Sequence, residues 1–180
     1  PVIQITDDKN GKMIIDGIPV TILREERNPL NIPWRQYGAD IVVDCSGNFK
    51  DPTVPADDKK GSIRGHLNSG AKVVVHSAPF KIKNKALSTP DDTTTLIYGI
   101  NHAAFDRKKH LLVSAASCTT TGLAHMVKPL LDNEDTSIIL TASMSTIHAV
   151  TNTQSVLDKM PKAGESDIRK TRSILNNIIL

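Results

Sequence analysis

The chain has 180 residues, of which 39% are hydrophobic, which is enough for one ordinary domain or for two small or incomplete ones. Its 22 Lys and Arg residues against 19 Asp and Glu residues give a formal net charge of +3, and only 3% of residues are aromatic. Because binding of nucleic acid needs a clustered basic face and aromatic stacking platforms, this composition argues against such a partner. No segment approaches the roughly 20 apolar residues that span a bilayer, and no secretory signal pattern is present. We therefore expect a cytoplasmic protein without a membrane partner.

The chain has two cysteines, Cys45 and Cys118. They are too few for a disulfide framework, and no CxxC or HxxxH spacing indicates a metal site, so we expect no metal. Cys45 follows a predicted buried strand and is expected to be an inert core residue. Cys118 is the better candidate for chemistry.

The first third of the chain alternates short β-branched segments with turns. Strands are predicted over residues 2–6, 12–15 and 20–23. The pair Asp16-Gly17 between the last two is typical of a hairpin, because glycine accepts the positive φ of a tight turn.

A parallel sheet is predicted from the segments that follow. Residues 40–44 and 71–76 are typical of buried parallel strands, and a helix over 62–68 joins them into a βαβ unit. Two more strands are predicted over 96–99 and 111–114. The first part of the chain is therefore α/β, with an open sheet.

Three segments are predicted to lack regular structure. Residues 50–61 and 81–94 are polar, charged and rich in Pro, Asp and Lys, and we interpret them as surface loops without a function. Residues 151–161 are predicted to form an irregular loop.

The last third of the chain begins with a predicted helix from Thr119, in which five apolar residues share one face: Leu123, Met126, Val127, Leu130 and Leu131. Pro129 lies inside it, so a kink or an early end is expected. Residues 138–147 are predicted to form a long strand, and a final helix is predicted over 167–178 with Ser166 as its N-cap.

The candidate chemistry lies where a strand meets a helix. The strand over 111–114 leads through Ser117 to Cys118 at the first turn of the next helix, where free backbone N–H groups and the helix dipole favour an anion. Such a position lowers the pKa of a thiol, and a nearby imidazole such as His148 would activate it further. On spacing alone, an inert cysteine and a structural histidine are the commoner outcomes.

At these residues the sequence resembles the glyceraldehyde-3-phosphate dehydrogenase family. Residues 114–120 resemble its nucleophile motif and residues 145–151 its histidine motif. Further segments resemble the family in the same order: 26–29, 32–34, 44–49, 66–79, 98–102 and 167–179. The resemblance covers essentially the whole chain apart from the two long polar loops.

The resemblance implies a catalytic pair, Cys118 as nucleophile and His148 as general base, in the glycolytic oxidation of glyceraldehyde 3-phosphate to 1,3-bisphosphoglycerate through a thiohemiacetal and a thioester. It implies a set of residues that bind the sugar phosphate and inorganic phosphate: Ser117, Thr119, Thr151, Thr153, Arg169 and Arg172, with the choice between the two arginines open. It also implies a set that binds NAD: Arg27, Ser46, Gly47, Phe49, Ser77 and Asn152.

The resemblance further implies the domain organisation. Residues 1–117 would be the later part of a Rossmann-type NAD(P)-binding domain, and residues 118–180 the start of an α+β catalytic domain. The resemblance implies NAD as the cofactor. NADP stays open, because no GxGxxG motif and no acidic ribose ligand are present in the sequence. The family usually has Asn where Ala115 and Thr121 stand. The complete protein would be a homotetramer.

Two alternatives remain at this point. One is a related dehydrogenase acting on erythrose 4-phosphate. The other is an inactive fragment or interaction module that retains the motifs. We expect residues 1–180 alone to lack dehydrogenase activity and measurable NAD affinity, because pyrophosphate binding depends on a Gly-rich turn that the sequence does not contain.

Overall fold

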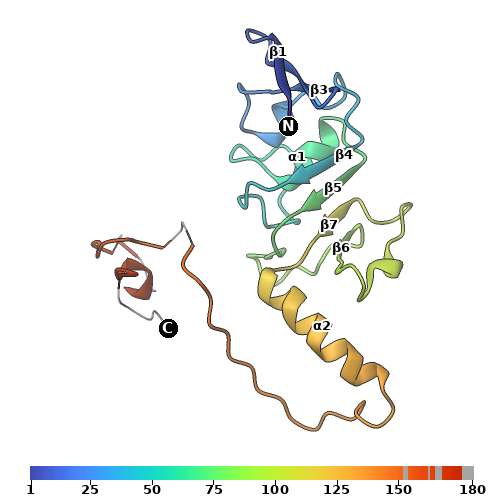
Figure 1. The fold of residues 1–180 in the computed structure, drawn as a ribbon, viewed down its shortest axis with the longest axis vertical. Helices are drawn as coiled ribbons and strands as arrows, with labels where there is room; N and C mark the ends of the chain where they lie inside the picture. Colours follow the sequence, from blue (N-terminus) through green and yellow to red (C-terminus); the bar gives the residue numbers. More distant parts are fainter. Residues whose placement is uncertain (152–153, 162, 165–167, 176–180) are drawn as a thin grey trace. The chain divides into compact units, whose positions relative to one another are not determined.

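A computed structural model of the chain describes residues 1–151, 154–161, 163–164 and 168–175. The chain divides into two compact units, Pro1–Ile138 and Ile139–Leu180, which are described separately. The first unit contains two sheets and the helices α1 and α2 (Figure 1).

The first sheet is an antiparallel meander of β1 (Ile3–Asp7), β2 (Lys12–Ile15) and β3 (Ile18–Thr21). The predicted hairpin is confirmed, with Asp16 at φ 47° and Gly17 at φ 82°. The third strand begins two residues earlier than predicted, because the two-residue turn already places Ile18 opposite Ile15.

The second sheet is wholly parallel and confirms the predicted α/β class. Its strands are β4 (Ile41–Asp44), β5 (Val73–His76), β6 (Thr93–Thr95) and β7 (Leu112–Ser114), in the order β4-β5-β7-β6 (Figure 1). Helix α1 (Ile63–Asn68) connects β4 to β5, and Ser62 caps it by accepting a hydrogen bond from the Arg64 N–H.

The prediction of a strand over residues 96–99 is wrong. The strand at this place is β6, which begins three residues earlier, with its first two residues inside the segment 81–94 that was predicted to be a loop. Its threonines are β-branched and pair with β7. The apolar segment after it turns away, because the Ile97 N–H donates to the Asn101 side chain at 2.7 Å.

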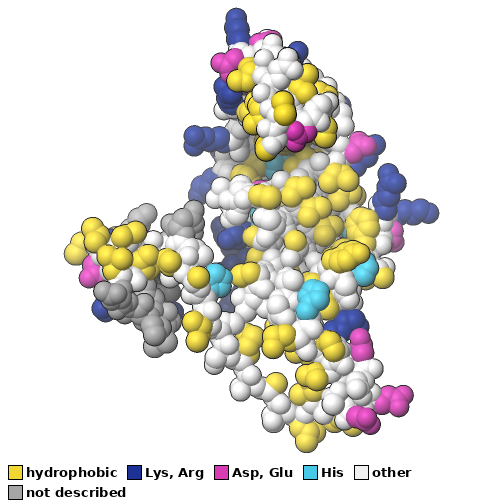
Figure 2. Space-filling view, viewed as in Figure 1, with side chains coloured by type: hydrophobic (Ala, Val, Ile, Leu, Met, Phe, Trp, Pro, Cys, Tyr) yellow, Lys and Arg dark blue, Asp and Glu magenta, His cyan; other side chains and the backbone are white. Residues whose placement is uncertain are grey.

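The core lies between α1 and one face of the parallel sheet. Its buried members are Val42, Ile63, Ala71, Val74 and Leu112, and Trp34, Phe49, Leu67 and Phe80 pack against them. Only alternate residues of β4 are buried, so the prediction of a buried strand holds for one of its two faces. Ile41 and Val43 are 66% and 60% exposed, and hydrophobic side chains show over this part of the unit in Figure 2.

Helix α2 (Cys118–Asp132) confirms the predicted helix and begins one residue earlier. It continues through Pro129 for three more residues, so the expected early end is wrong. The residues of its predicted apolar face are largely exposed in this unit, among them Met126 and Leu131.

The second unit differs most from the sequence predictions. Residues 138–147 have no regular secondary structure, because a strand exists only when it pairs, and no described residue forms a ladder with them. Of the helix predicted over 167–178, the described residues 168–175 form only a short 3-10 turn, η3 (Ile168–Thr171). The backbone around it bonds instead to the preceding loop, since the Lys159 N–H donates to the Thr171 carbonyl and the Ile174 N–H to that of Ser155. Residues 166–167 and 176–178 lie outside the described residues.

Candidate active site

The parallel sheet brings polar residues together at its carboxyl edge. Asp44, His76 and Ser114 end three neighbouring strands and lie in register with one another. The predicted cofactor residues follow directly: Ser46 and Gly47 come after β4, and Ser77 comes after β5. Open α/β sheets bind nucleotides at this edge, so these residues occupy the expected place.

A buried pair of side chains, Asp44 and His76, underlies this edge. Asp44 is 6% exposed and His76 is fully buried, with 3.3 Å between Asp44 Oδ2 and His76 Nδ1. Burial raises the pKa of Asp44, but the interaction with His76 and the hydrogen bonds from Ser46 outweigh it and lower the pKa to about 2. Asp44 is therefore ionised at neutral pH. Its other oxygen accepts the Ser46 N–H at 2.8 Å, which fixes the start of the following loop.

The side chain of Ser114 fixes the turn between β7 and α2. Its hydroxyl donates to the Ala78 carbonyl at 2.9 Å and accepts the Ala116 N–H at 3.1 Å. The Ala115 N–H donates to the His76 carbonyl at 2.9 Å. Ala116 is buried and has φ 62°, a left-handed conformation that residues with a side chain seldom adopt. These contacts hold the turn immediately before the candidate nucleophile.

Cys118 is the first residue of α2, which confirms its predicted place at a helix N-terminus. Ser117 caps the helix by accepting the Thr120 N–H at 3.2 Å. The Cys118 side chain is exposed, and its Sγ lies 3.8 Å from the Thr119 hydroxyl. A helix of this length stabilises negative charge at its first turn, so the position favours a thiolate that is open to solvent.

The second cysteine does not lie where it was predicted. Cys45 follows β4 directly, and the prediction of an inert core residue is wrong because its side chain is exposed. Side chains alternate across a strand, and the preceding residue Asp44 takes the buried side.

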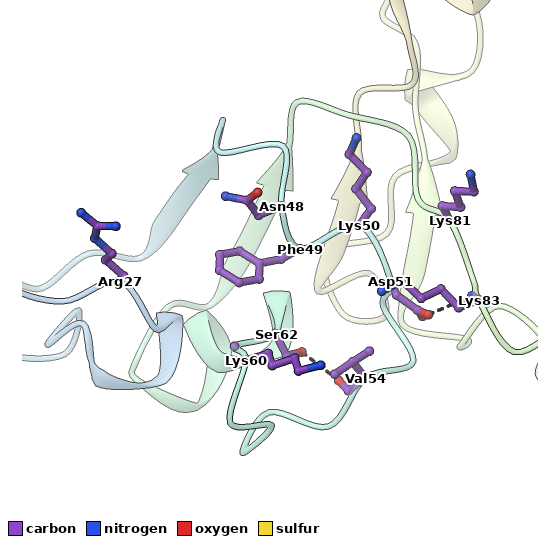
Figure 3. A pocket seen from close by; sticks show the side chains of 11 residues that line it. Arg27, Asn48, Phe49, Lys50, Asp51, Val54, Lys60, Ser62, Lys81 and Lys83 are labelled. Carbon is purple, nitrogen blue, oxygen red and sulfur yellow. Dashed lines mark hydrogen bonds between the residues drawn. The ribbon is translucent and has the colours of Figure 1, made fainter. Parts of the chain in front are cut away.

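Two of the predicted cofactor residues, Arg27 and Phe49, line one pocket of about 460 Å³ (Figure 3). The remaining walls come largely from the segments 50–61 and 81–94, which the sequence analysis interpreted as loops without a function. Their high lysine content was the signal in the sequence, but the convergence of the two segments was not visible there.

The other predicted site residues belong to the second unit. His148 Nδ1 lies 2.6 Å from the Ala149 carbonyl oxygen, and the Thr151 N–H donates to the Gln154 side chain at 2.9 Å. Arg169 lies in η3, and Arg172 forms an exposed ion pair with Asp158 at 3.8 Å. Asn152 and Thr153 lie outside the described residues. The pairing of Cys118 with His148 stays a prediction from the sequence.

Within the described ranges, no helix is both long and apolar enough to cross a bilayer. The same part of the chain holds no group of three or more His, Cys, Asp and Glu side chains that could bind a metal ion.

A parallel sheet with polar groups at its carboxyl edge, joined to a cysteine-bearing helix, defines a Rossmann-type nucleotide-binding protein. Residues 3–52 match the NAD binding domain of glyceraldehyde 3-phosphate dehydrogenase, and residues 117–179 match the C-terminal domain of the same enzyme. The chain belongs to the glyceraldehyde-3-phosphate dehydrogenase family.

Individual relatives carry the same name. A glyceraldehyde-3-phosphate dehydrogenase of Streptomyces coelicolor is 37% identical over 165 residues, which is 92% of this chain and 42% of that relative. One from Chlamydia pneumoniae is 40% identical over 86% of this chain and 39% of its own length. One from Lactarius deterrimus is 40% identical over 95% of this chain and 50% of its own length. The chain thus spans about two fifths to one half of the curated relatives it matches.

Proposed function

We propose that the complete protein containing this chain oxidises glyceraldehyde 3-phosphate with NAD and inorganic phosphate to 1,3-bisphosphoglycerate. The observation that carries the proposal is the position of Cys118, which is exposed at the first turn of α2 directly after the carboxyl edge of a parallel sheet. Family membership supports it, because relatives of this sequence are named for that activity. A cytoplasmic location and a homotetrameric assembly belong to the same proposal.

The residues at the sheet edge fit a dinucleotide. Gly47 has φ 68° and open space where a side chain would stand, so a ligand can approach the backbone closely there. Ser46 and Ser77 flank it with exposed hydroxyl groups, and the Phe49 ring offers an apolar surface beyond. The nicotinamide cofactor, when bound, accepts the hydride that leaves the substrate.

The reaction begins at Cys118. Its thiolate attacks the aldehyde carbon and forms a thiohemiacetal, whose developing negative charge is stabilised by the backbone N–H of Cys118 itself. His148 takes the hydroxyl proton as the carbon is oxidised, which leaves a thioester on the sulfur. Inorganic phosphate then cleaves the thioester, releases the acyl phosphate and restores the thiolate.

Phosphate groups are held by hydroxyl and guanidinium donors in this scheme. Ser117 and Thr119 flank the thiol, and helix N-termini bind such anions readily. Thr151 and Thr153, with Arg169 or Arg172, bind the phosphate of the substrate. The ion pair of Arg172 with Asp158 is exposed and long, so it leaves this side chain available for a stronger anion.

A rapid-mixing experiment on the complete protein tests the proposal. With glyceraldehyde 3-phosphate and NAD but no phosphate, we expect a burst of NADH equivalent to the active Cys118, followed by a halt. Adding phosphate should then restore turnover, and Cys118→Ser should abolish the burst. Sustained turnover without phosphate would rule out phosphate as the group that cleaves the thioester, and a burst in the variant would rule out Cys118 as the nucleophile. Erythrose 4-phosphate in parallel measures the preference between the two aldehydes.

A further inference from the structure

Helix α2, which carries Cys118, depends on polar contacts for its direction. None of its 15 residues is buried in this unit, so apolar packing does not fix the helix there. Figure 1 shows it extending away from the parallel sheet. Its start is held by the turn at Ser114 and Ala116. A second fixed point is needed to set the direction of an axis, and His125 provides one.

The ring of His125 lies between two backbone carbonyl groups. Its Nδ1 is 2.8 Å from the Thr121 carbonyl oxygen, one turn back in α2, and its Nε2 is 3.1 Å from the Tyr98 carbonyl oxygen in the loop after β6. A carbonyl oxygen only accepts, so each ring nitrogen must donate a hydrogen to form both bonds. Neutral imidazole carries hydrogen on one nitrogen, and imidazolium carries it on both. The complete contact therefore requires the imidazolium form.

The loop end of this contact is itself held in place. The Gly99 N–H belongs to the same peptide group as the Tyr98 carbonyl, and it donates to His102 Nδ1 at 3.0 Å. Gly99 has φ 81°, a conformation that glycine adopts freely. One peptide group is thus bound at its oxygen by His125 and at its nitrogen by His102. Hydrogen bonds at the two ends of a peptide group polarise it and strengthen each other.

The contact should respond to pH because the state of the His125 ring decides how many bonds it makes. Lys128 and Asp132 of α2 pair with each other at 3.0 Å, so their charges compensate. The other titratable groups on the two segments are Cys118 of α2 and, in the loop, Tyr98 and His102. Loss of the imidazolium proton replaces one hydrogen bond of His125 with two facing lone pairs, which costs the bond and adds repulsion.

We propose that His125 is a positioning residue for Cys118: as an imidazolium it ties α2 to the Tyr98–Gly99 peptide and fixes the direction in which the helix presents the thiol. The two residues are separated by about two helical turns, or about 10 Å along the axis, and share one face. A helix held at its start and again two turns later cannot swing about its first turn. The effect on the reaction rests on the proposed function, whereas the attachment of the helix does not.

Hydrogen exchange of the complete protein, measured by mass spectrometry without substrate, tests the attachment. Protection factors are compared because they divide out the base catalysis of exchange itself. We expect the protection of α2 to fall about tenfold between pH 7 and pH 9, as the histidine proton is lost, while that of α1 stays constant. His125→Gln, whose amide does not titrate, should protect α2 less at pH 7 and show no fall toward pH 9.

His110→Gln is the matched control. His110 is a partly exposed histidine whose Nδ1 accepts the Asp106 N–H at 3.0 Å, outside this contact, so the variant should keep the pH dependence of the parent protein. Constant protection of α2 in the parent between the two pH values overturns the proposal without recourse to any variant. The same fall in His125→Gln as in the parent also overturns it.

Single-turnover hydride transfer at pH 7 tests the positioning. His125→Gln should slow the transfer about tenfold and leave alkylation of Cys118 by iodoacetamide within about twofold of the parent rate, because a charge about 10 Å away in water affects a thiol only weakly. An unaffected transfer rate, or an alkylation slowed as much as the transfer, overturns the positioning role. Because exchange is measured without substrate, a protein with no dehydrogenase activity would still report whether His125 holds the helix.

Discussion

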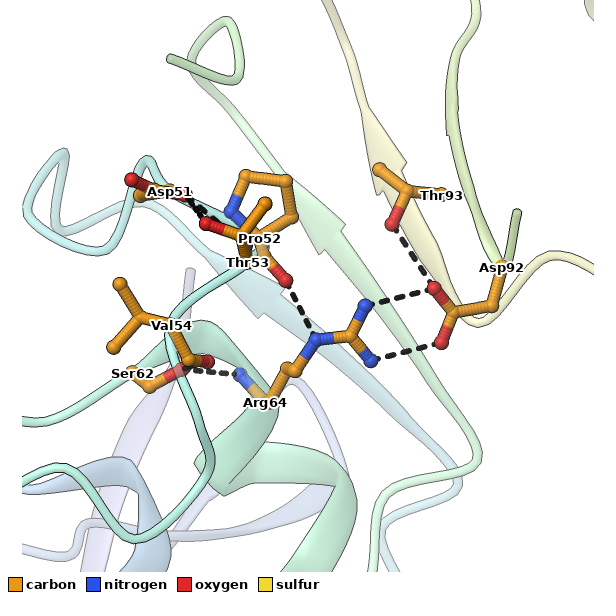
Figure 4. A network of polar contacts seen from close by, with 8 residues as sticks. All are labelled: Asp51, Pro52, Thr53, Val54, Ser62, Arg64, Asp92 and Thr93. Carbon is orange, nitrogen blue, oxygen red and sulfur yellow. Dashed lines mark hydrogen bonds and ion pairs between the residues drawn. The ribbon is translucent and has the colours of Figure 1, made fainter. Parts of the chain in front are cut away.

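Arg64 of α1 donates to both carboxylate oxygens of Asp92, from Nη1 and Nη2 at 2.8 Å each (Figure 4). Its Nε donates to the Pro52 carbonyl at 2.6 Å. Asp92 in turn precedes β6, and its own carbonyl accepts the Leu111 and Leu112 N–H groups. One guanidinium therefore joins the helix, the loop of residues 50–61 and the residue that precedes the edge strand of the parallel sheet.

Arg64→Lys should lower the free energy of unfolding by about 1–2 kcal/mol, because an ammonium group cannot replace the planar fork and the Nε bond together. Urea denaturation at neutral pH measures the change. Arg24→Lys is the control, since the Arg24 ion pair with Asp8 is long and highly exposed and should contribute almost nothing. Equal stability of the two variants would show that the fork does not stabilise this unit.

Asp44 should make stability depend on pH. The folded-state pKa is about 2, below the value of about 3.9 in unfolded chains, so the carboxylate stabilises the fold above pH 4. This contribution, on the order of 2 kcal/mol, is lost as the pH falls through 4 toward 2. Asp44→Asn should be less stable than the parent protein at pH 7 and equal to it near pH 2. Asp40→Asn, which removes an exposed ion pair with Lys72, is the control and should change stability little at pH 7.

Two helical glycines provide a matched pair. A Cβ on Gly65 of α1 would stand 2.7 Å from the Leu30 nitrogen and 3.0 Å from Pro29 Cβ, so Gly65→Ala should destabilise the protein by about 1–3 kcal/mol. Gly122 of α2 has nothing within 4 Å, so Gly122→Ala should stabilise it by up to about 1 kcal/mol through helix propensity alone. The midpoint of thermal unfolding of both variants measures these changes. A shift of the midpoint with the same sign in both would contradict the packing described for α1.

The two exposed cysteines should differ in reactivity. Iodoacetamide at pH 6 should modify Cys118 of the complete protein roughly tenfold faster than Cys45, because the helix N-terminus and the expected imidazole favour its thiolate. Mass spectrometry of the two peptides over time gives both rates in one sample, with Cys45 as the internal reference. Equal rates across the pH range would remove the activated thiol from the mechanism.

His148→Asn should slow hydride transfer in the complete protein by roughly a hundredfold or more, as loss of a general base does. NAD affinity should stay nearly unchanged, because most of the predicted cofactor contacts lie elsewhere. Single-turnover kinetics separate the two effects. A variant with unimpaired transfer would exclude His148 as the base.

The features that the sequence predicted correctly have local causes. The turn at Asp16-Gly17 needs only two residues with positive φ, and the two predicted helices begin where Ser62 and Ser117 accept N–H groups two or three positions away. The position of Cys118 at the start of α2 followed from the same kind of signal.

The features that were missed depend on residues far apart in the sequence. Residues 138–147 have the composition of a strand, but composition does not supply a pairing partner. The basic pocket exists because the Lys83 N–H reaches Asp51, a contact across 32 positions. Neither segment contains a motif that would indicate the other.

Ala116 has a left-handed backbone conformation just before α2, and this conformation affects the orientation of Cys118 but not the reactivity of its thiol. An alanine in this conformation costs about 1–2 kcal/mol relative to the right-handed form, so the surrounding core must impose it. Ser114 and the burial of Ala116 set the direction in which α2 leaves the sheet before Cys118 is reached. The orientation of the Cys118 thiol and its reactivity therefore depend on different residues. We expect substitutions at Thr119 to change the reactivity of the Cys118 thiol. Substitutions at Ser114 should instead change the orientation of a thiol that keeps its reactivity.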